Sequence, residues 1–155
     1  IAIFDKRTHA GEHYLEVQLP FLQYCLDDVE VVPVCLTRPG GDRAEQLGRD
    51  LAAVIEGLER NVALVASTDL THYEDHETAA DADEPITEAI RALDTDAIAE
   101  AVRCGHTMCG PWATVTTLTA ASELGVTGGD LLQYATSGET AGGNDRVVGY
   151  CSMVF

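Results

Sequence analysis

Helical spacing of apolar residues occurs in five stretches of the chain. Side chains that recur three or four positions apart share one helix face, so each stretch is expected to pack against a core. The predicted helices span residues 12–26, 42–59, 81–93, 95–103 and 110–124. Pro20 lies inside the first and is expected to kink or break it, whereas Gly110-Pro111 suits the first turn of the last.

Short apolar runs between these helices predict strands. They are residues 30–36, 62–67, 131–136 and 147–155. The run VALVAS at 62–67 is apolar almost throughout, as is typical of a parallel strand covered on both faces. Strands that alternate with helices predict an α/β fold with a mainly parallel sheet flanked by helices. Residues 68–80 are expected to form a polar loop, and the Gly-rich residues 137–145 a surface turn or a mobile lid.

Asp69 and His72 directly follow the run at 62–67, where α/β sheets with parallel strands place their sites. A carboxylate and an imidazole three positions apart in a tight turn can converge on one metal ion. Alternatively, the Asp can orient the His as a general base. The simpler explanation is turn chemistry, in which the Asp caps the loop and the His packs locally.

Cys109 lies immediately before the helix start at Gly110-Pro111. Free backbone N–H groups and the helix dipole there favour a thiolate, which is a soft metal ligand or a nucleophile. The alternative is a small residue that fits a tight turn. Cys104 is expected to be structural, and His106 is either a group that supports the site or an ordinary loop residue.

Three further side chains could line a cleft at this site. His13 and Glu16 share one side of the first predicted helix, although a capping pair with a half-buried imidazole also explains this segment. Trp112, the only tryptophan, is expected to pack in the first turn of its helix and could wall the pocket. His9 and His76 lie in polar loops and are expected to be solvated.

The formal net charge is −17, from 26 acidic and 9 basic residues, and Lys6 is the only lysine. Dispersed carboxylates with scarce lysine favour a surface adapted to high salt, and an ordinary acidic domain is the alternative. Nucleic acid and anionic membranes are poor partners for either surface. No stretch reaches the roughly 18 consecutive apolar residues of a membrane span, so we expect a soluble protein.

The five cysteines include no CxxC pair, and their odd number argues against a disulfide framework. This usage fits a reducing cytoplasm. Cys25, Cys35 and Cys151 lie in apolar runs and are expected to belong to the core.

Six segments together resemble the Memo family, also called AmmeMemoRadiSam system protein B. In chain order they are GEHYLEVQLPFLQ, VVPVCL, STDLTHY, CGHTMCGPWATVTTL, LLQYATSGE and VVGYCSMVF. Each alone is weak, but the six in this order are specific and cover nearly the whole chain. The resemblance implies a fold like that of class III extradiol dioxygenases and an iron or copper site built from two histidines and a cysteine.

The resemblance also assigns roles to the candidate residues. The cysteine of the family's C-G motif falls on Cys109, which implies that Cys109 is a metal ligand. The Asp and His of the S-S-D-x-x-H motif fall on Asp69 and His72, with Thr68 in place of the second Ser. They would act as acid/base groups or tune the metal. Tyr14 stands where the family's E-H-S-x-E motif has Ser.

The family's two ligand histidines belong to P-H-A-G-Y and G-x-x-H type motifs that do not occur in this chain. The sequence also starts with Ile inside the apolar run IAIF. We therefore expect residues 1–155 to be the C-terminal part of a single Memo-like domain whose N-terminal part is missing. Such a fragment would carry an incomplete ligand set and bind metal weakly.

Three functions are compatible with these residues. The first is a metal-dependent redox or oxygenase-like enzyme that acts with a radical-SAM partner, with iron or copper on Cys109. The second is a non-enzymatic scaffold that retains a dioxygenase-like cleft. The third is a hydrolase with Cys109 as nucleophile, His72 as base and Asp69 as orienting group, in an order that matches no known hydrolase motif. No nucleotide-binding fingerprint occurs, and the residues specify no substrate.

Overall fold

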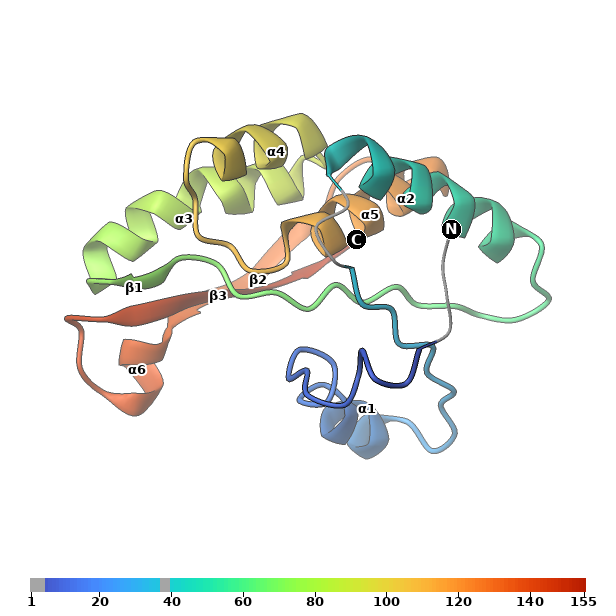
Figure 1. Ribbon diagram of the computed structural model, residues 1–155, viewed down its shortest axis with the longest axis horizontal. Coiled ribbons are helices and arrows are strands. Elements are labelled where there is room, and N and C mark those ends of the chain that lie inside the picture. The colour runs from blue at the N-terminus through green and yellow to red at the C-terminus, as the bar shows by residue number, and fades with distance from the viewer. Residues whose placement is uncertain (1–4, 37–39) are drawn as a thin grey trace. The chain divides into compact units, whose positions relative to one another are not determined.

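A computed structural model describes residues 5–36 and 40–155 of the chain (Figure 1). The chain divides into two compact units, Ile1–Arg38 and Pro39–Phe155. None of the helices in the described ranges has the length and hydropathy that a membrane span requires.

The described residues of the first unit form one short helix, α1 (Leu19–Cys25), in place of the helix predicted over residues 12–26. Pro20 lies in its first turn, because the fixed φ of proline suits a helix start. Pro20 therefore sets where the helix begins and does not kink a longer one. The helix has no buried residues, and Cys25 is exposed, so its predicted place in a core is wrong.

The second unit places its four long helices on one side of a small sheet (Figure 1). These helices are α2 (Gly41–Glu56), α3 (His76–Arg91), α4 (Thr95–Arg103) and α5 (Pro111–Glu123). The strands are β1 (His72–Glu74), β2 (Asp130–Thr136) and β3 (Val147–Val154), in the order β1-β3-β2. Both strand pairs are antiparallel.

The mainly parallel sheet predicted from the sequence is not what the described residues form. The runs at 30–36 and 62–67 form no strand, and Val65 is 58% exposed where a covered strand was expected. A strand requires a neighbour for its ladder hydrogen bonds, and the described part of the chain places no strand beside either run. The apolar pattern predicts burial, but it does not specify which strand would lie beside each run.

Capping carboxylates explain where two of the helices begin. The Asp75 carboxylate accepts the backbone N–H of Thr78 at 3.1 Å and its hydroxyl at 2.7 Å. This cap starts α3 at His76, so residues 76–80 are helical and the predicted loop is wrong there. Asp94 caps α4 in the same way, through the N–H of Ala97 at 2.9 Å.

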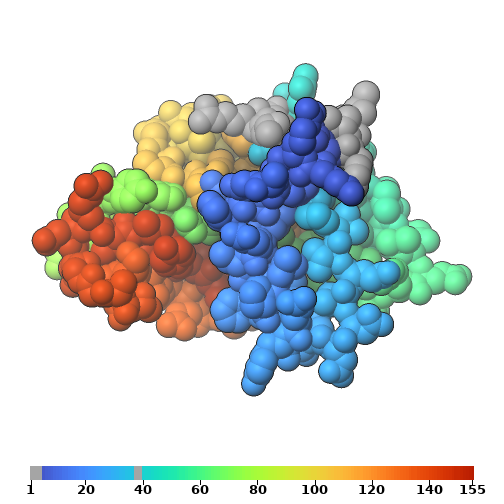
Figure 2. Space-filling model, turned by 60° about the horizontal axis from the view of Figure 1, so that its bottom comes forward, coloured from blue at the N-terminus to red at the C-terminus, as the bar shows by residue number. Residues whose placement is uncertain are grey.

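The Gly-rich connection between β2 and β3 is a short helix, α6 (Ser137–Ala141), followed by a turn. The Thr136 and Glu139 side chains form a capping box at its start. The turn lies against the start of α3, because the Asn144 carbonyl accepts the His76 N–H at 2.9 Å; the orange-red and lime surfaces meet there in Figure 2. The His76 ring is 2.9 Å from the Thr136 hydroxyl and is half-buried, where a solvated ring was predicted.

The core lies between the helices and the sheet. Its large buried side chains come from the segment before β1, from α3, α4 and α5, and from the loop that joins α4 to α5: Leu70, Ile86, Ile90, Ile98, Met108, Val115 and Leu118. Partly buried residues of β2 and β3 pack against this cluster, among them Tyr134, Cys151 and Met153. The helix-facing side of the sheet therefore contributes to the same core.

Helices α2 and α5 approach each other closely at Gly48. A Cβ atom there would lie 2.6 Å from the Thr116 carbonyl oxygen and 2.7 Å from the Thr119 Cβ. The Thr116 hydroxyl donates to the Ala44 carbonyl at 2.9 Å across this contact. A larger residue at position 48 would force the two helices apart.

We predict that Gly48→Ala lowers the free energy of unfolding by about 1–3 kcal/mol through overpacking. In a helix with free space at this position, the same change would raise the free energy of unfolding by up to about 1 kcal/mol. A decrease would therefore indicate the close contact between the two helices. The matched control is Gly41→Ala, whose Cβ would lie 3.6 Å from the Trp112 ring. Urea unfolding of both variants tests this, and a Gly48→Ala protein as stable as the control would contradict it.

Candidate functional site

The site lies where the segment before β1 runs beside the loop that joins α4 to α5. The Asp69 N–H donates to Cys109 Sγ at 3.1 Å, and the Cys109 N–H donates to the Asp69 carbonyl at 3.2 Å. The Gly110 N–H donates to the Thr68 hydroxyl at 2.8 Å. These reciprocal hydrogen bonds bring residues 40 positions apart in the sequence to one place.

His72 is held by contacts with two other parts of the chain. Its N–H donates to the Thr107 hydroxyl at 2.8 Å, and its Cα is paired with Val148 of β3. The register shifts between His72 and Glu74, and Tyr73 between them has a φ of 65°. Such a bulge with a left-handed residue changes the direction of the neighbouring side chains.

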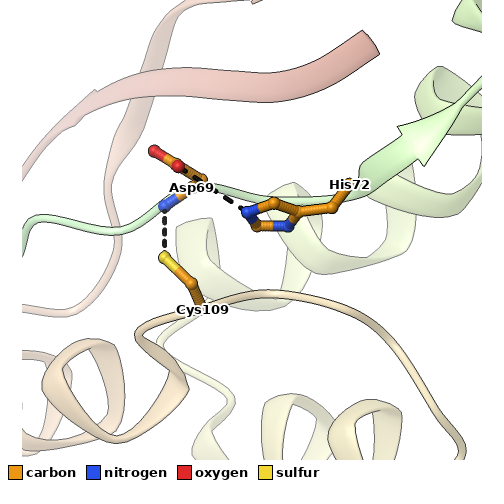
Figure 3. A group of neighbouring side chains, drawn as sticks. All are labelled: Asp69, His72 and Cys109. Carbon is orange, nitrogen blue, oxygen red and sulfur yellow. Dashed lines mark hydrogen bonds and ion pairs between the residues drawn. The ribbon is translucent and has the colours of Figure 1, made fainter. Parts of the chain in front are cut away.

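Asp69, His72 and Cys109 each offer one ligand atom, and these atoms lie within 4.8 Å of one another (Figure 3). His72 Nε2 is 3.7 Å from Asp69 Oδ2, which is too long for a hydrogen bond. Cys109 is exposed, whereas the His72 side chain is only 20% exposed. The structure therefore places the three side chains singled out in the sequence in one partly open cluster.

The cluster joins a thiol, an imidazole and a carboxylate, a donor set that suits transition metals. His72 Nδ1 is buried and has no hydrogen-bond partner among the described residues. Cys109 Sγ also lies 3.6 Å from the Thr68 hydroxyl, so the segment at 68–69 provides hydrogen-bond contacts to the sulfur. The Cys109 sulfur, the His72 imidazole and the Asp69 carboxylate can therefore face a common ligand.

Tyr150 is a neighbour of the cluster that the sequence reading missed. It follows Gly149, whose carbonyl accepts the Leu70 N–H at 2.9 Å and whose N–H donates to the Thr71 carbonyl at 2.9 Å. Burial, followed by the negative charges of Asp69 and Cys109, raises the pKa of the Tyr150 hydroxyl. Tyr150 therefore keeps its proton and can donate a hydrogen bond near the cluster. Only the strand pairing reveals this position.

The buried carboxylate of Asp83 supports the segments that form the site. The Asp83 side chain is fully buried, and its Oδ1 accepts the Thr71 N–H at 3.0 Å. His106 Nε2 lies 3.1 Å from the same oxygen, and the Tyr134 hydroxyl donates to Oδ2 at 2.8 Å. Burial raises the pKa of Asp83, but the hydrogen bonds from His106, Thr71 and Tyr134 outweigh it and hold this pKa below the usual range.

The sequence did contain a signal for Asp83. It lies on one helical face with Ala79, Ile86 and Ile90, all of which are buried, so an acid interrupts an apolar stripe. His106 was weighed as a supporting group or a loop residue, and the structure shows it almost buried and bonded to Asp83.

The other candidate residues make contacts within their own units. His13 Nδ1 is 3.0 Å from Glu16 Oε1 within the first unit, and both side chains are exposed. Trp112 packs against the core in the first turn of α5. Cys104 is exposed and donates to Glu100 Oε1 at 3.3 Å. His9 is half-buried, where a solvated ring was predicted.

The family model described as Memo-like protein matches residues 1–154. The chain belongs to the Memo-like family. A MEMO1 family protein of Methanopyrus kandleri is 43% identical over 153 residues, which cover 97% of this chain and 54% of the relative. MEMO1 family proteins of Methanothermobacter thermautotrophicus and Thermotoga neapolitana are 37% and 39% identical, with 96% and 97% of this chain covered and 54% and 53% of the relatives. This Memo-like chain thus spans about half the length of these relatives.

Gly110 is the closest approach between the two segments of this Memo-like site. A Cβ there would lie 2.9 Å from both Cβ and Oγ1 of Thr68. We predict that Gly110→Ala separates the segments and lowers the free energy of unfolding by about 1–3 kcal/mol. In Gly128→Ala, the control, the new Cβ would meet only the Arg91 carbonyl, at 3.6 Å. Equal unfolding midpoints for the two variants would count against this packing.

The lowered pKa of Asp83 predicts a pH dependence of stability. An unfolded Asp titrates near pH ~4, so the ionised carboxylate stabilises the fold above that pH. This stabilisation is lost as the pH falls through the lower folded pKa. In urea unfolding from about pH 7 to about pH 3, Asp83→Asn should be less stable than wild type at neutral pH, with the difference shrinking in acid. A difference that stays constant over this range would show that Asp83 does not contribute by ionisation.

Proposed function

We propose that this Memo-family protein is a metal-binding, redox or oxygenase-like protein in which Cys109 ligates iron or copper. The observation that carries the proposal is the convergence of Cys109, His72 and Asp69 ligand atoms within 4.8 Å. Protein ligands about 2.0–2.3 Å from a metal lie roughly 3–4 Å from one another. A small contraction of the cluster would meet that spacing.

The individual groups support this assignment. The sulfur accepts the Asp69 N–H and lies 3.6 Å from the Thr68 hydroxyl, and a thiolate accepts hydrogen bonds well from both kinds of donor. Asp69 Oδ2 and His72 Nε2 are not hydrogen-bonded to each other at 3.7 Å, so both groups can turn to a shared ion or to a substrate proton. A three-donor set leaves positions for water, substrate or further protein ligands.

A bound iron or copper ion would supply one-electron redox chemistry at the exposed side of Cys109. Side chains of the protein would then accept and donate protons. The His72 imidazole accepts or donates a proton, the Asp69 carboxylate stabilises the charged ring, and the Tyr150 hydroxyl donates a hydrogen bond to an anionic group. The resemblance to AmmeMemoRadiSam system protein B supports a radical-SAM protein as the partner that uses this chemistry.

The arrangement supports a metal ligand better than a hydrolytic nucleophile. A Cys–His hydrolase needs a hydrogen bond between the nucleophile and its base. The sulfur is instead hydrogen-bonded to the backbone of Asp69, and the His72 Nδ1 atom is buried without a partner among the described residues.

Metal analysis of the protein as the cell produces it, purified under reducing conditions, tests the proposal. We predict that Cys109→Ala loses at least tenfold in affinity for iron or copper and loses the sulfur-to-metal charge-transfer band. His72→Ala and Asp69→Asn should weaken binding less, by roughly tenfold at most, if they only tune the metal. Cys104→Ala is the matched control, because Cys104 is also an exposed cysteine.

Two results would contradict the proposal. One is a Cys109→Ala protein that binds iron or copper as tightly as wild type. The other is a wild-type protein that takes up neither metal, whether isolated or after reconstitution. A metal-free protein that loses partner binding on Cys109→Ala or His72→Ala would instead favour the scaffold function.

A further inference from the structure

His106 has a defined tautomer because each ring nitrogen has a distinct partner. Its Nδ1 accepts the Met108 N–H at 3.2 Å, so that nitrogen carries no proton. The proton of the neutral ring is therefore on Nε2, which donates to Asp83 Oδ1 at 3.1 Å. The ring lies almost fully buried, with 9% of the side chain exposed.

Asp83 Oδ1 is hydrogen-bonded to both of the segments that form the site. It accepts the Thr71 N–H, in the residue before His72, and it accepts the His106 ring proton from the loop that leads to Cys109. His106 Nε2 also lies 3.2 Å from the Thr71 hydroxyl. The carboxylate thus connects two segments that belong to no common helix or strand pair.

Gly149 of β3 has no side chain and so leaves the space that the Asp83 carboxylate occupies. A Cβ at Gly149 would collide with Asp83 Oδ2, and Tyr134 of β2 donates to that same oxygen. The fold therefore fixes both oxygens of a fully buried group. Hydrogen bonds between buried groups are stronger than those between exposed groups, and the bond from the Asp69 N–H to Cys109 Sγ is an exposed one.

We propose that Asp83 and His106 are positioning residues that hold the Cys109 loop against Asp69 and His72. The relevance of this device to metal binding rests on the proposed function, but the device itself is a property of the metal-free protein. Breaking the Asp83–His106 bond releases the loop locally, while the core that surrounds Asp83 stays folded.

Two amide substitutions separate the bonds that His106 makes. His106→Gln places an amide nitrogen near the position of Nε2 and keeps a donor to Asp83. His106→Asn places an amide oxygen near the position of Nδ1, keeps the acceptor for the Met108 N–H and loses the bond to Asp83. Tyr134→Phe is the matched control, because it removes a different hydrogen bond from Asp83 and leaves the loop untouched.

The readout is amide hydrogen exchange in the metal-free protein, measured for the N–H groups of Asp69 and Cys109 and for core amides of α5. We expect His106→Asn to speed exchange of the two site amides about tenfold more than it speeds exchange of the core amides. His106→Gln should retain most of the protection at these amides. Tyr134→Phe should lower global stability without a selective effect on them.

Three outcomes would overturn the inference. His106→Asn could change site and core amides by the same factor, which would make the pair a general stabilising contact. The Asn and Gln variants could release the site amides equally, which would show that the Asp83 bond is not the cause. His106→Asn could also fail to fold while Tyr134→Phe folds, which would make the pair a requirement for the core. Because no metal is present, failure of the metal assignment leaves each of these results readable.

Discussion

The buried carboxylate of Asp83 is the interaction on which the second unit of the chain depends. An ionised group without contact to water requires several hydrogen bonds to offset its desolvation, and Asp83 receives them from Thr71, His106 and Tyr134. These donors come from the segment before β1, the loop after α4, and β2. Asp83 of α3 therefore connects three segments that share no helix or strand pair with one another.

This arrangement explains how a site can be built from loops. Asp69 and Cys109 lie in segments without helix or strand geometry, and exposed loops of this kind are usually the most mobile parts of a fold. Here the backbone of each segment hydrogen-bonds to the other, and both are anchored to a fully buried group. Cys109 is exposed, but the Asp83 carboxylate that anchors its loop is fully buried.

Much of the helical structure could be predicted from the sequence, because periodicity and capping residues act locally. Helices α4 and α5 and strands β2 and β3 lie within one or two residues of their predicted bounds. The start of α3 was missed because Asp75, a capping residue, was read as part of a loop. The sheet could not be predicted, since an apolar run such as 62–67 does not specify its neighbours, and in the described residues this run forms no strand. Asp69, His72 and Cys109 could be singled out as candidates, because their residue types and motif positions suggested chemistry, and the structure places them together. Asp83 and Tyr150 were not, because their roles depend on contacts across the fold.

The absence of a side chain at Gly149 has a consequence for how this protein can change over evolutionary time. The volume that a methyl group would fill there is occupied by the Asp83 carboxylate. A lineage cannot acquire a side chain at position 149 while it keeps the acid at position 83, so the two positions are expected to change in a fixed order. Loss of the acid would have to come first, and with it the loop anchor.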